Sequence, residues 1–563
     1  MLRLKNFISK KFNSIKNLIY LFGLKPSGLP RWKKLLNTEQ KKIFTEIIKD
    51  KKNILICTSG GAHKVVNIFN SIMAFALSFK GAKVDFLLCD KVLPACQMAA
   101  MDFIKDKTYA NQGPISLCNH CLLAGNTAFE NMGLNINHYS QYLTPKDHQS
   151  AEEIVKSITD FKNIRKFKID DIDIGEHALA GALRYFAVGD LKVISDDVSN
   201  KILRRYINAA ILTKIAFERL IKENLFDVIL LDHGLYVPNG IIMSVAKKHR
   251  IKTVAFMTSY RKNTILFSRN DTYHKTFVNE KDKLWREIDF NNKVKNKIDN
   301  YLHSRRYGTD DWEFYYNKPT FDGEKFKEKN EIKNYIVTFM TNIIWDAQLE
   351  FPANIFNDMM ESIIETIKFY EKNENITLVI RVHPGEKNHD RPSNQKVEDE
   401  IRIIFPNLPI NLIIVSPNDP ISSYALAEVS DCVIIYGSKI GLELSSIGVP
   451  VIVTGEAWLS HEEIQLIPKT KTEYFDILKK TPFKKRLDKH QIDLAKKFSY
   501  HFFFRRMIEI KSLNYHPKTW PPYKIKDDIY DILLKQKDPG LEFIADAIIE
   551  DKELIFKDEN YLG

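Results

Sequence analysis

Strand–helix–strand alternation, present in two parts of the chain, is the feature that most constrains its fold. In the first part, strand patterns lie at residues 53–58, 83–89, 227–232 and 253–257, with helical patterns at 65–79 and 239–248 and a largely helical stretch at 140–225. In the second part, strand patterns lie at 335–340, 377–382, 412–415, 432–435 and 449–453, with helical patterns at 354–371, 421–429 and 438–447. Alternation at this spacing predicts parallel sheets covered by helices on both faces.

The chain has 563 residues, which is more than one ordinary domain of roughly 150 residues needs. The expected fold class is α/β of the GT-B type, with two Rossmann-like domains facing a central cleft, because such sheets bind ligands at the carboxyl ends of their strands. The predicted divisions are a basic amphipathic segment (1–45), an N-terminal Rossmann-like acceptor domain (46–305), a polar linker (306–333), a C-terminal Rossmann-like nucleotide-sugar domain (334–483) and a helical tail (484–563) that returns to the first domain.

The net charge favours anionic partners. The sequence has 83 basic and 71 acidic side chains, a formal charge of +12. It contains no familiar nucleic-acid motif, so a nucleic-acid partner is not expected. Six cysteines are too few for a secreted disulfide scaffold of this size, which is consistent with the reduced cytoplasm.

The first residues form a basic amphipathic pattern. Apolar residues recur at helical spacing with lysines between them, at Leu4, Phe7, Ile8, Phe12 and Ile15. Lysines interrupt the apolar region, so this is not expected to be a secretory leader. The segment could lie on the anionic inner face of the cytoplasmic membrane, or it could pack on its own protein. No run reaches the roughly 18 apolar residues of a membrane span, so a cytoplasmic, peripheral protein is expected.

Residues 436–458 (YGSKIGLELSSIGVPVIVTGEAW) have the pattern of a phosphate-binding turn between a strand and a helix. Gly437 allows a tight turn, and Ser438 is a good N-cap for a helix whose N-terminus would attract a phosphate. Glu443 can accept hydrogen bonds from ribose hydroxyls. The remaining expected nucleotide contacts of this segment are Tyr436, Lys439 and Glu456. An ordinary strand–helix–strand unit with a capped helix explains the same pattern.

Residues 381–386 (RVHPGE) follow the strand pattern at 377–382. Pro384 fixes the turn. His383 would then face the same ligand as the 436–458 segment and donate to its phosphate or protonate the leaving group. Arg381 would add a permanent positive charge. An isolated His-Pro pair is weak evidence for a functional site. Its position at the end of a predicted strand makes this evidence stronger.

The two segments resemble the C-terminal domain of bacterial capsule and surface-polysaccharide biosynthesis proteins, a GT-B group that includes Kdo-transferase-like glycosyltransferases. Further similarity lies at residues 88–96, 232–240, 259–262, 271–274 and 341–346, so that it spans roughly residues 50–510. The resemblance implies transfer of a sugar from a nucleotide-activated donor to a growing capsule polysaccharide or glycolipid, with no cofactor required. His-Pro turns also occur in GT-B sialyltransferases, where the histidine serves the CMP phosphate; by this analogy a CMP-activated acidic sugar is one possible donor, with His383 in that role.

Acceptor chemistry is expected from the first domain, where an inverting reaction needs a base within reach of a hydroxyl. His63, Asp232 and His233 follow predicted strands and are the candidates for this base. His177 is a further candidate for the acceptor pocket. An anionic group could bind the turn formed by Tyr260, Arg261 and Lys262. Each of these residues, taken alone, is equally typical of a structural position.

The sequence leaves other functions open. Cys96, Cys118 and Cys121 include one pair at metal-ligand spacing, but a second such pair is missing, so no metal is expected and packed thiols are the alternative. A nucleotide-sugar epimerase would need the same nucleotide contacts without an acceptor. A non-catalytic glycan- or lipid-binding component of a polysaccharide assembly complex is the third reading.

Overall fold

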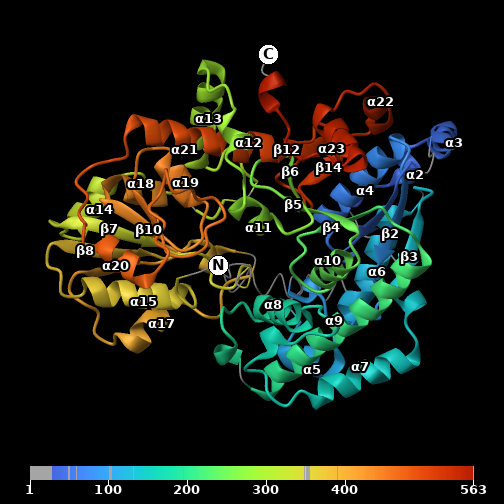
Figure 1. The fold of residues 1–563 in the computed structure, drawn as a ribbon, viewed down its shortest axis with the longest axis horizontal. Helices are drawn as coiled ribbons and strands as arrows, with labels where there is room; N and C mark the ends of the chain where they lie inside the picture. Colours follow the sequence, from blue (N-terminus) through green and yellow to red (C-terminus); the bar gives the residue numbers. More distant parts are fainter. Residues whose placement is uncertain are drawn as a thin grey trace. The chain divides into compact units, whose positions relative to one another are not determined.

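The computed structural model describes residues 28–47, 51–58, 60–100, 104–130, 132–194, 196–312, 314–316, 318–347, 349, 355–389 and 391–561. Its contacts divide the chain into two compact units, each described here by itself (Figure 1). Unit 1 contains the described parts of Met1–Tyr185, Ile194–Tyr273 and Met507–Phe556. Unit 2 contains those of Phe186–Val193, His274–Arg506 and Lys557–Gly563.

Unit 1 is built on a seven-stranded sheet in the order β12-β6-β5-β4-β1-β2-β3. The strands are β1 (Asn53–Cys57), β2 (Lys83–Leu88), β3 (Asn135–His138), β4 (Val228–Asp232), β5 (Lys252–Thr258), β6 (Thr264–Arg269) and β12 (Met507–Glu509). The first five are parallel, and β6 is antiparallel to both of its neighbours. The parallel part has the strand order of a Rossmann fold, 3-2-1-4-5.

Helices cover this sheet because its strands are apolar on both faces. The helices of unit 1 include α4 (Lys64–Phe79), α5 (Asp106–Gln112), α6 (Ile115–Phe129), α7 (Pro145–Ser157), α8 (Ile174–Phe186), α9 (Asp197–Glu223), α10 (Asn239–Lys248), α22 (Ile529–Leu534) and α23 (Pro539–Glu550). One face of the sheet shares a core with α4 and α23. Helix α10 contacts β4 and β5 and packs on α9, which also contacts α5 and α7 (Figure 1).

Unit 2 has a five-stranded parallel sheet in the order β11-β10-β7-β8-β9. The strands are β7 (Tyr335–Met340), β8 (Ile376–Arg381), β9 (Leu412–Val415), β10 (Cys432–Ile435) and β11 (Val451–Val453). Read from β9 to β11, this is again the order 3-2-1-4-5. The prediction of two Rossmann-like α/β units is therefore confirmed.

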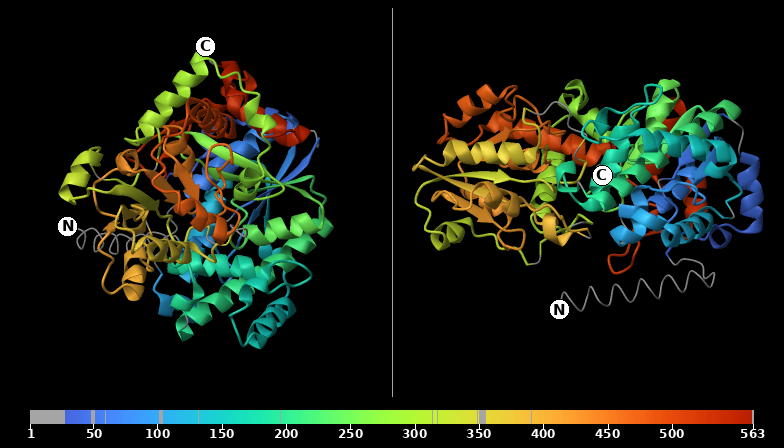
Figure 2. Two further views of the ribbon diagram at one scale, coloured as in Figure 1. Left: turned by 60° about the vertical axis from the view of Figure 1, so that its left-hand side comes forward. Right: turned by 90° about the horizontal axis from the view of Figure 1, so that it is seen from below.

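Alternate residues of each strand in unit 2 enter different cores, as the pleat of a strand requires. Val337 and Phe339 pack with α15 (Met359–Tyr370), α17 (Val397–Ile404) and α20 (Lys471–Leu478). Ile336 instead packs with α14 (Gly323–Lys329) and α18 (Ser423–Val429). The two further views show helices on both sides of this sheet (Figure 2).

The domain boundaries differ from those expected. The units divide at Tyr273 instead of within 306–333. That segment is polar because it runs over the surface of unit 2, yet it contains α14, whose Phe326 is buried against α18. Residues 28–47 are also part of unit 1, where Trp32 is fully buried and its ring lies 4.7 Å from that of Phe75. Residues 1–27, which hold the amphipathic pattern, lie outside the described residues.

The tail divides between the units. Residues 484–506 belong to unit 2, with α21 (Lys489–Tyr500) and a π-helical turn (His501–Arg506). Residues 507–556 belong to unit 1 and are not purely helical, since they contain β12, β13 (Leu513–Tyr515) and β14 (Tyr523–Ile525). Among the described helices, none has the length and apolar character needed to cross a bilayer.

Candidate functional site

The carboxyl ends of the strands of unit 2 form the first candidate site. The strand order reverses between β7 and β10, and such a reversal leaves a ligand-binding crevice at the carboxyl ends of these strands. Thr341 and Asn342 follow β7, His383 lies two residues after β8, and Gly437 lies two residues after β10. The structure therefore brings the two predicted segments, 381–386 and 436–458, to the same edge of one sheet.

His383 is partly buried and held from two sides. Its backbone N–H donates to Thr341 Oγ1 at 2.9 Å, and its ring Nδ1 accepts the Gly385 N–H at 3.0 Å. Because Nδ1 is an acceptor, the proton of the neutral ring is on Nε2. Burial, followed by the charges of Lys439 and Arg381, lowers the pKa of His383 to about 3. At neutral pH the side chain is neutral and donates from Nε2–H. It is therefore better suited to hydrogen-bond a phosphate oxygen than to act as a base.

The turn after β10 lies close to this histidine. The Gly437 N–H donates to Asn342 Oδ1 at 3.4 Å, which joins the ends of β10 and β7. Lys439 follows in the same turn, and its positive charge contributes to the lowered pKa of His383. A neutral donor beside an ammonium group is a suitable environment for an anion.

Ser438 is not the N-cap that the sequence predicts. The helix α19 is shorter than expected, Ile440–Ser445, and the N-cap position is occupied by Lys439, whose side chain makes no capping bond. The Ser438 hydroxyl accepts the Ile440 N–H at 3.4 Å, one residue before the cap. It remains in the turn, beside the end of β10.

Arg381 has a different role from the expected one. Its side chain is 1% exposed, and its guanidinium donates to the backbone carbonyls of Ser416, Asp419 and Ile421 at 2.6, 3.3 and 3.2 Å. The guanidinium thus joins the end of β8 to the loop after β9. The Nη1 and Nη2 groups of Arg381 already donate to backbone carbonyls of this unit. The residue would therefore affect a bound ligand through its positive charge and not through a direct hydrogen bond from these groups.

Glu443 is likewise not open for a ribose. It is 2% exposed and forms an ion pair with Arg305, with 3.0 Å between Oε1 and Nε, while Tyr424 donates its hydroxyl proton to Oε2. Arg305 also pairs with Asp311. The buried carboxylate joins α19 to the 301–311 region, which corrects its expected position facing the ligand.

The three other predicted residues of this site differ in position. Tyr436 is 3% exposed and its ring lies in the core that covers one face of the sheet, so its side chain is not available to a ligand as predicted. Pro384 is buried at the start of α16 (Gly385–Asn388) and sets the turn, as expected. Glu456 is partly buried in the loop after β11.

Four residues of unit 2 lie in the segments of family similarity 271–274 and 341–346 but are not among the site residues that the sequence predicts. Thr341 and Asn342 could have been found, because they are the first polar residues after the apolar run 335–340. His274 and Asp346 do not directly follow a predicted strand, so their only signal is the family similarity of segments 271–274 and 341–346. His274 is 5% exposed and its ring lies 5.4 Å from the Trp458 ring; burial lowers its pKa to about 3. The negative charge of Asp346 opposes the lowering of the pKa of both His274 and His383.

Unit 1 has its own strand reversal, between β1 and β4, and the predicted acceptor residues gather there. His63 is the N-cap of α4, where its Nδ1 accepts the Val66 N–H at 3.3 Å. Burial and the charge of Arg184 lower the pKa of His63 to about 4. As in unit 2, the neutral ring holds its proton on Nε2, so this histidine is a donor in the described state.

Asp232 and His233 end β4 on the other side of this reversal. Asp232 is fully buried, and its Oδ1 accepts a hydrogen bond from Asn239 Nδ2 at 2.8 Å. His233 has a left-handed backbone, with φ of 55°, and is partly buried with its ring 6.1 Å from the Tyr273 ring. This backbone conformation is uncommon for a residue with a side chain and is found preferentially at functional turns.

His177 has no free ring nitrogen for acceptor chemistry. Its Nδ1 is 2.7 Å from the Leu235 carbonyl oxygen and its Nε2 is 3.0 Å from Ser244 Oγ. The ring therefore holds the 233–238 loop against α10, which corrects the expectation of a ligand contact.

The turn of Tyr260, Arg261 and Lys262 connects β5 to β6 and faces the C-terminal strands. Arg261 Nη2 lies 4.0 Å from a Glu509 oxygen, and Lys262 Nζ lies 5.3 Å from the centre of the Tyr515 ring. Tyr260 is partly buried in the same turn. With an acidic neighbour close by, the turn is less suited to anion binding than its sequence suggests.

Burial keeps the cysteines of unit 1 protonated. Cys96, Cys118 and Cys121 have raised pKa values, chiefly because burial disfavours the thiolate. Cys121 Sγ accepts the Ala62 N–H at 3.3 Å. Within the described ranges these three do not form a group whose ligand atoms converge within 4.8 Å.

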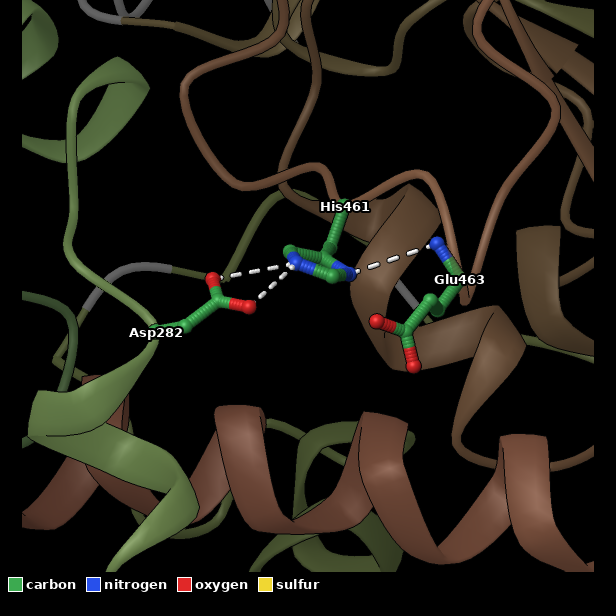
Figure 3. A group of neighbouring side chains, drawn as sticks. All are labelled: Asp282, His461 and Glu463. Atoms are coloured by element: carbon green, nitrogen blue, oxygen red, sulfur yellow. Dashed lines mark hydrogen bonds and ion pairs between the residues drawn. The ribbon is translucent and has the colours of Figure 1, made fainter.

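One group in unit 2 does converge in this way, formed by Asp282, His461 and Glu463 (Figure 3). His461 Nε2 lies 3.1 Å from Asp282 Oδ1, while its Nδ1 accepts the Glu463 N–H at 3.3 Å. Arg286 donates to Asp282 at 2.9 Å and to Glu463 at 2.6 Å. The guanidinium already pairs with both carboxylates, so the group is an ion network that joins α12 (Lys283–Arg286) to the loop after β11.

Comparisons with known proteins give similarity of structure. No protein-family model and no curated protein sequence matches the chain. Similar solved structures include the β-Kdo 2,4- and 2,7-transferases of Thermosulfurimonas dismutans KpsC, each 12% identical, with TM-scores of 0.34 and 0.32 over 55% and 57% of this chain and 87% and 89% of theirs. The UDP-GlcNAc 2-epimerase of Neisseria meningitidis is 11% identical, with a TM-score of 0.24 over 80% of this chain and 95% of its own.

These structures include Kdo transferases, the group that the sequence resembles, and also an epimerase. At these identities and TM-scores they do not assign an activity. The functional proposal therefore rests on the residues of the two strand reversals.

Proposed function

We propose that the chain is a glycosyltransferase that moves a sugar from a nucleotide-activated donor to a capsule or other surface glycan or glycolipid. The observation that supports this most is the state of His383 at the strand reversal of unit 2. Because its Nδ1 accepts the Gly385 N–H, His383 has an Nε2–H that can donate to a phosphate oxygen, and the ammonium group of Lys439 in the turn after β10 would offset the phosphate charge.

The phosphate of the donor becomes more negative as the sugar leaves. A donor and an ammonium group already in place stabilise this charge without rearrangement, which is the main way that such sites lower a barrier. The bound phosphate would also raise the pKa of His383, since an adjacent negative charge favours the imidazolium. His383 could then donate a full proton to the leaving phosphate. The resemblance suggests a CMP-activated acidic sugar as the donor.

Unit 1 supplies the residues for the acceptor in this proposal. Asp232 has a carboxylate at the strand reversal of unit 1, and His233 follows it in a strained turn. In an inverting reaction the base would come from Asp232 or His233, because the Nδ1 of His63 already accepts a hydrogen bond; Asp232 is fully buried, so the turn would have to move for a hydroxyl to reach it. We expect no cofactor for this chemistry, and we propose that the reaction takes place at the cytoplasmic face of the membrane.

The test compares nucleotide binding and turnover of the native chain with those of His383→Ala and His383→Gln. His383→Ala should lower turnover at least tenfold, whereas His383→Gln, which restores an N–H near the Nε2 position, should recover part of it. His490→Ala, at an exposed position of α21, is the matched control and should have native turnover. Native turnover in His383→Ala would contradict the assigned role.

The same assay separates the alternatives. Nucleotide sugars are supplied with and without membrane glycolipid, and nucleotide release and donor isomerisation are followed. Release that depends on the acceptor supports the transferase. Isomerised donor without acceptor would instead show an epimerase, and absence of nucleotide binding would show a non-catalytic component.

A further inference from the structure

A small hairpin near the C-terminal end of the chain exposes a tryptophan. Its strands β13 and β14 pair in antiparallel register, with Leu513 opposite Ile525 and Tyr515 opposite Tyr523. The loop between them, residues 516–522, carries Trp520, which is 59% exposed. A large aromatic side chain exposed to this extent is unusual unless it meets an apolar or interfacial surface.

The base of the hairpin is fixed and its tip is ordered by its own hydrogen bonds. Tyr523 is 1% exposed and its ring lies 5.5 Å from that of Phe69 on α4. At the tip, the Thr519 N–H donates to the His516 carbonyl at 3.1 Å, and Thr519 Oγ1 donates to the Pro521 carbonyl at 3.0 Å. Trp520 is therefore exposed on a turn that its own hydrogen bonds hold in place, at the end of a hairpin whose base is buried.

The segment 511–526, which contains this tryptophan, has lysines and no acidic residue. Lys518 lies two residues before it, Lys524 lies on β14, and Lys511 precedes β13; all three are exposed. An indole ring with lysines around it is the combination that locates at the headgroup level of a membrane, with the ring at the boundary and the ammonium groups on anionic lipids.

The start of the described chain lies against the same tip. A Cβ atom added to Gly28 would lie 2.6 Å from Pro521 Cδ and 3.2 Å from the Trp520 carbonyl oxygen. Arg31 and Lys33, just after Gly28, are exposed. The basic amphipathic sequence of residues 1–27 is therefore joined to the chain at the tip of the hairpin, although the two are almost 500 residues apart in sequence.

We infer that the hairpin 513–525 is a membrane-docking element, with Trp520 as its interfacial anchor and an anionic lipid bilayer as its partner. Single weak membrane signals give only marginal binding, and stable attachment takes two. The hairpin is the second signal beside the amphipathic sequence. An exposed tryptophan can also stack on a sugar ring, but the lysines of the hairpin segment favour an anionic surface over a neutral glycan.

The experiment measures co-sedimentation of the full-length chain with vesicles of phosphatidylethanolamine and 30% phosphatidylglycerol, and with phosphatidylcholine vesicles. Trp520→Ser should weaken binding to the anionic vesicles about fivefold. Lys518→Glu/Lys524→Glu should weaken it at least twentyfold, since each basic residue near an anionic surface contributes about fivefold. Binding of the native chain should fall with added salt and be weak on phosphatidylcholine.

Matched controls lie elsewhere in unit 1. Leu225 is 85% exposed, and Lys162 and Lys222 are exposed, so Leu225→Ser and Lys162→Glu/Lys222→Glu make the same chemical changes outside the hairpin. Both should bind like the native chain. Quenching of tryptophan fluorescence by brominated lipid should decrease in Trp520→Phe, which tests contact by the indole itself.

Three results would overturn the inference: vesicle binding unchanged in both hairpin variants, equal losses in the controls, or binding of the hairpin to soluble polysaccharide with none to anionic vesicles. Nucleotide turnover with a soluble acceptor should be native in Trp520→Ser, so the outcome is independent of the proposed reaction.

Discussion

At the residue scale, one buried arginine explains why Glu443 is not a nucleotide ligand. Arg305 is paired with Glu443 and with Asp311, and both carboxylates are less than a tenth exposed. Tyr301 adds a hydrogen bond to Asp311 at 2.8 Å. Buried charges of this kind stabilise the fold only together, because removing one of them leaves a buried opposite charge without its partner.

This set predicts that Arg305→Met strongly destabilises the protein. Two buried carboxylates would lose their cation, so we expect the free energy of unfolding to fall by about 3–5 kcal/mol. Urea unfolding followed by circular dichroism measures it. The neighbouring Arg306 pairs with Glu428 at a more exposed position, so Arg306→Met should cost less than about 1 kcal/mol. Equal costs for the two variants would contradict a buried role for Arg305.

The same residues show what the sequence could and could not reveal. The turn at Pro384 and the position of His383 after a strand are local features, and the sequence predicts them. The partners of Arg381 and Glu443 come from Ser416 and Arg305, far away in the chain, and no local pattern indicates them. From the sequence alone, Arg381 and Glu443 are predicted to contact the ligand, because they lie next to the predicted site. In the structure both side chains instead pair with other residues of the fold.

At the element scale, the strands with continuous apolar runs were predictable, and the others were not. β7, β9 and β10 begin and end where the sequence predicts, because both faces of each strand are covered. β3 is polar, with the sequence NINH, and pairs only with β2 at the edge of the sheet. The C-terminal strands β12 to β14 have three residues each, too few to give a clear strand pattern, and β12 joins its sheet through the distant β6, so the sequence predicts a helical tail.

Helix α23 owes its position to a capping carboxylate that also holds the hairpin. Asp538 is fully buried; its Oδ1 accepts the Leu541 N–H at 3.2 Å, and its Oδ2 accepts the Ser512 N–H at 2.7 Å. Removing it would uncap the helix and leave a buried N–H without an acceptor. Asp538→Ala should therefore lower the free energy of unfolding by about 3 kcal/mol, measured by urea unfolding.

An exposed cap provides the comparison for this prediction. Asp488 caps α21 by accepting the Gln491 N–H at 2.9 Å, and it has no second buried bond to replace. Asp488→Ala should cost only about 1 kcal/mol, the usual value of a cap. A cost for Asp538→Ala no larger than this would show that its bond to Ser512 contributes little.

At the scale of the whole molecule, three histidines kept neutral by their surroundings make stability dependent on pH. Burial is the main cause in each case, and it lowers the pKa of His63 to about 4 and those of His274 and His383 to about 3. In the unfolded chain the same groups titrate near 6.5. Below that pH the unfolded chain binds protons that the folded chain does not, so the free energy of unfolding falls as the pH falls.

His274 gives the sharpest test, because it is 5% exposed. Above about pH 7 this histidine does not lower the free energy of unfolding. From pH 6.5 towards 3 it lowers that free energy progressively, and the loss is about 2 kcal/mol at pH 5. His274→Gln removes this titration. Between pH 7.5 and pH 5, its free energy of unfolding should therefore fall by about 2 kcal/mol less than that of the native chain, whatever its stability at pH 7.5. His490→Gln, at an exposed position, should follow the native pH dependence; if His274→Gln follows it too, the histidine is not held neutral by the fold.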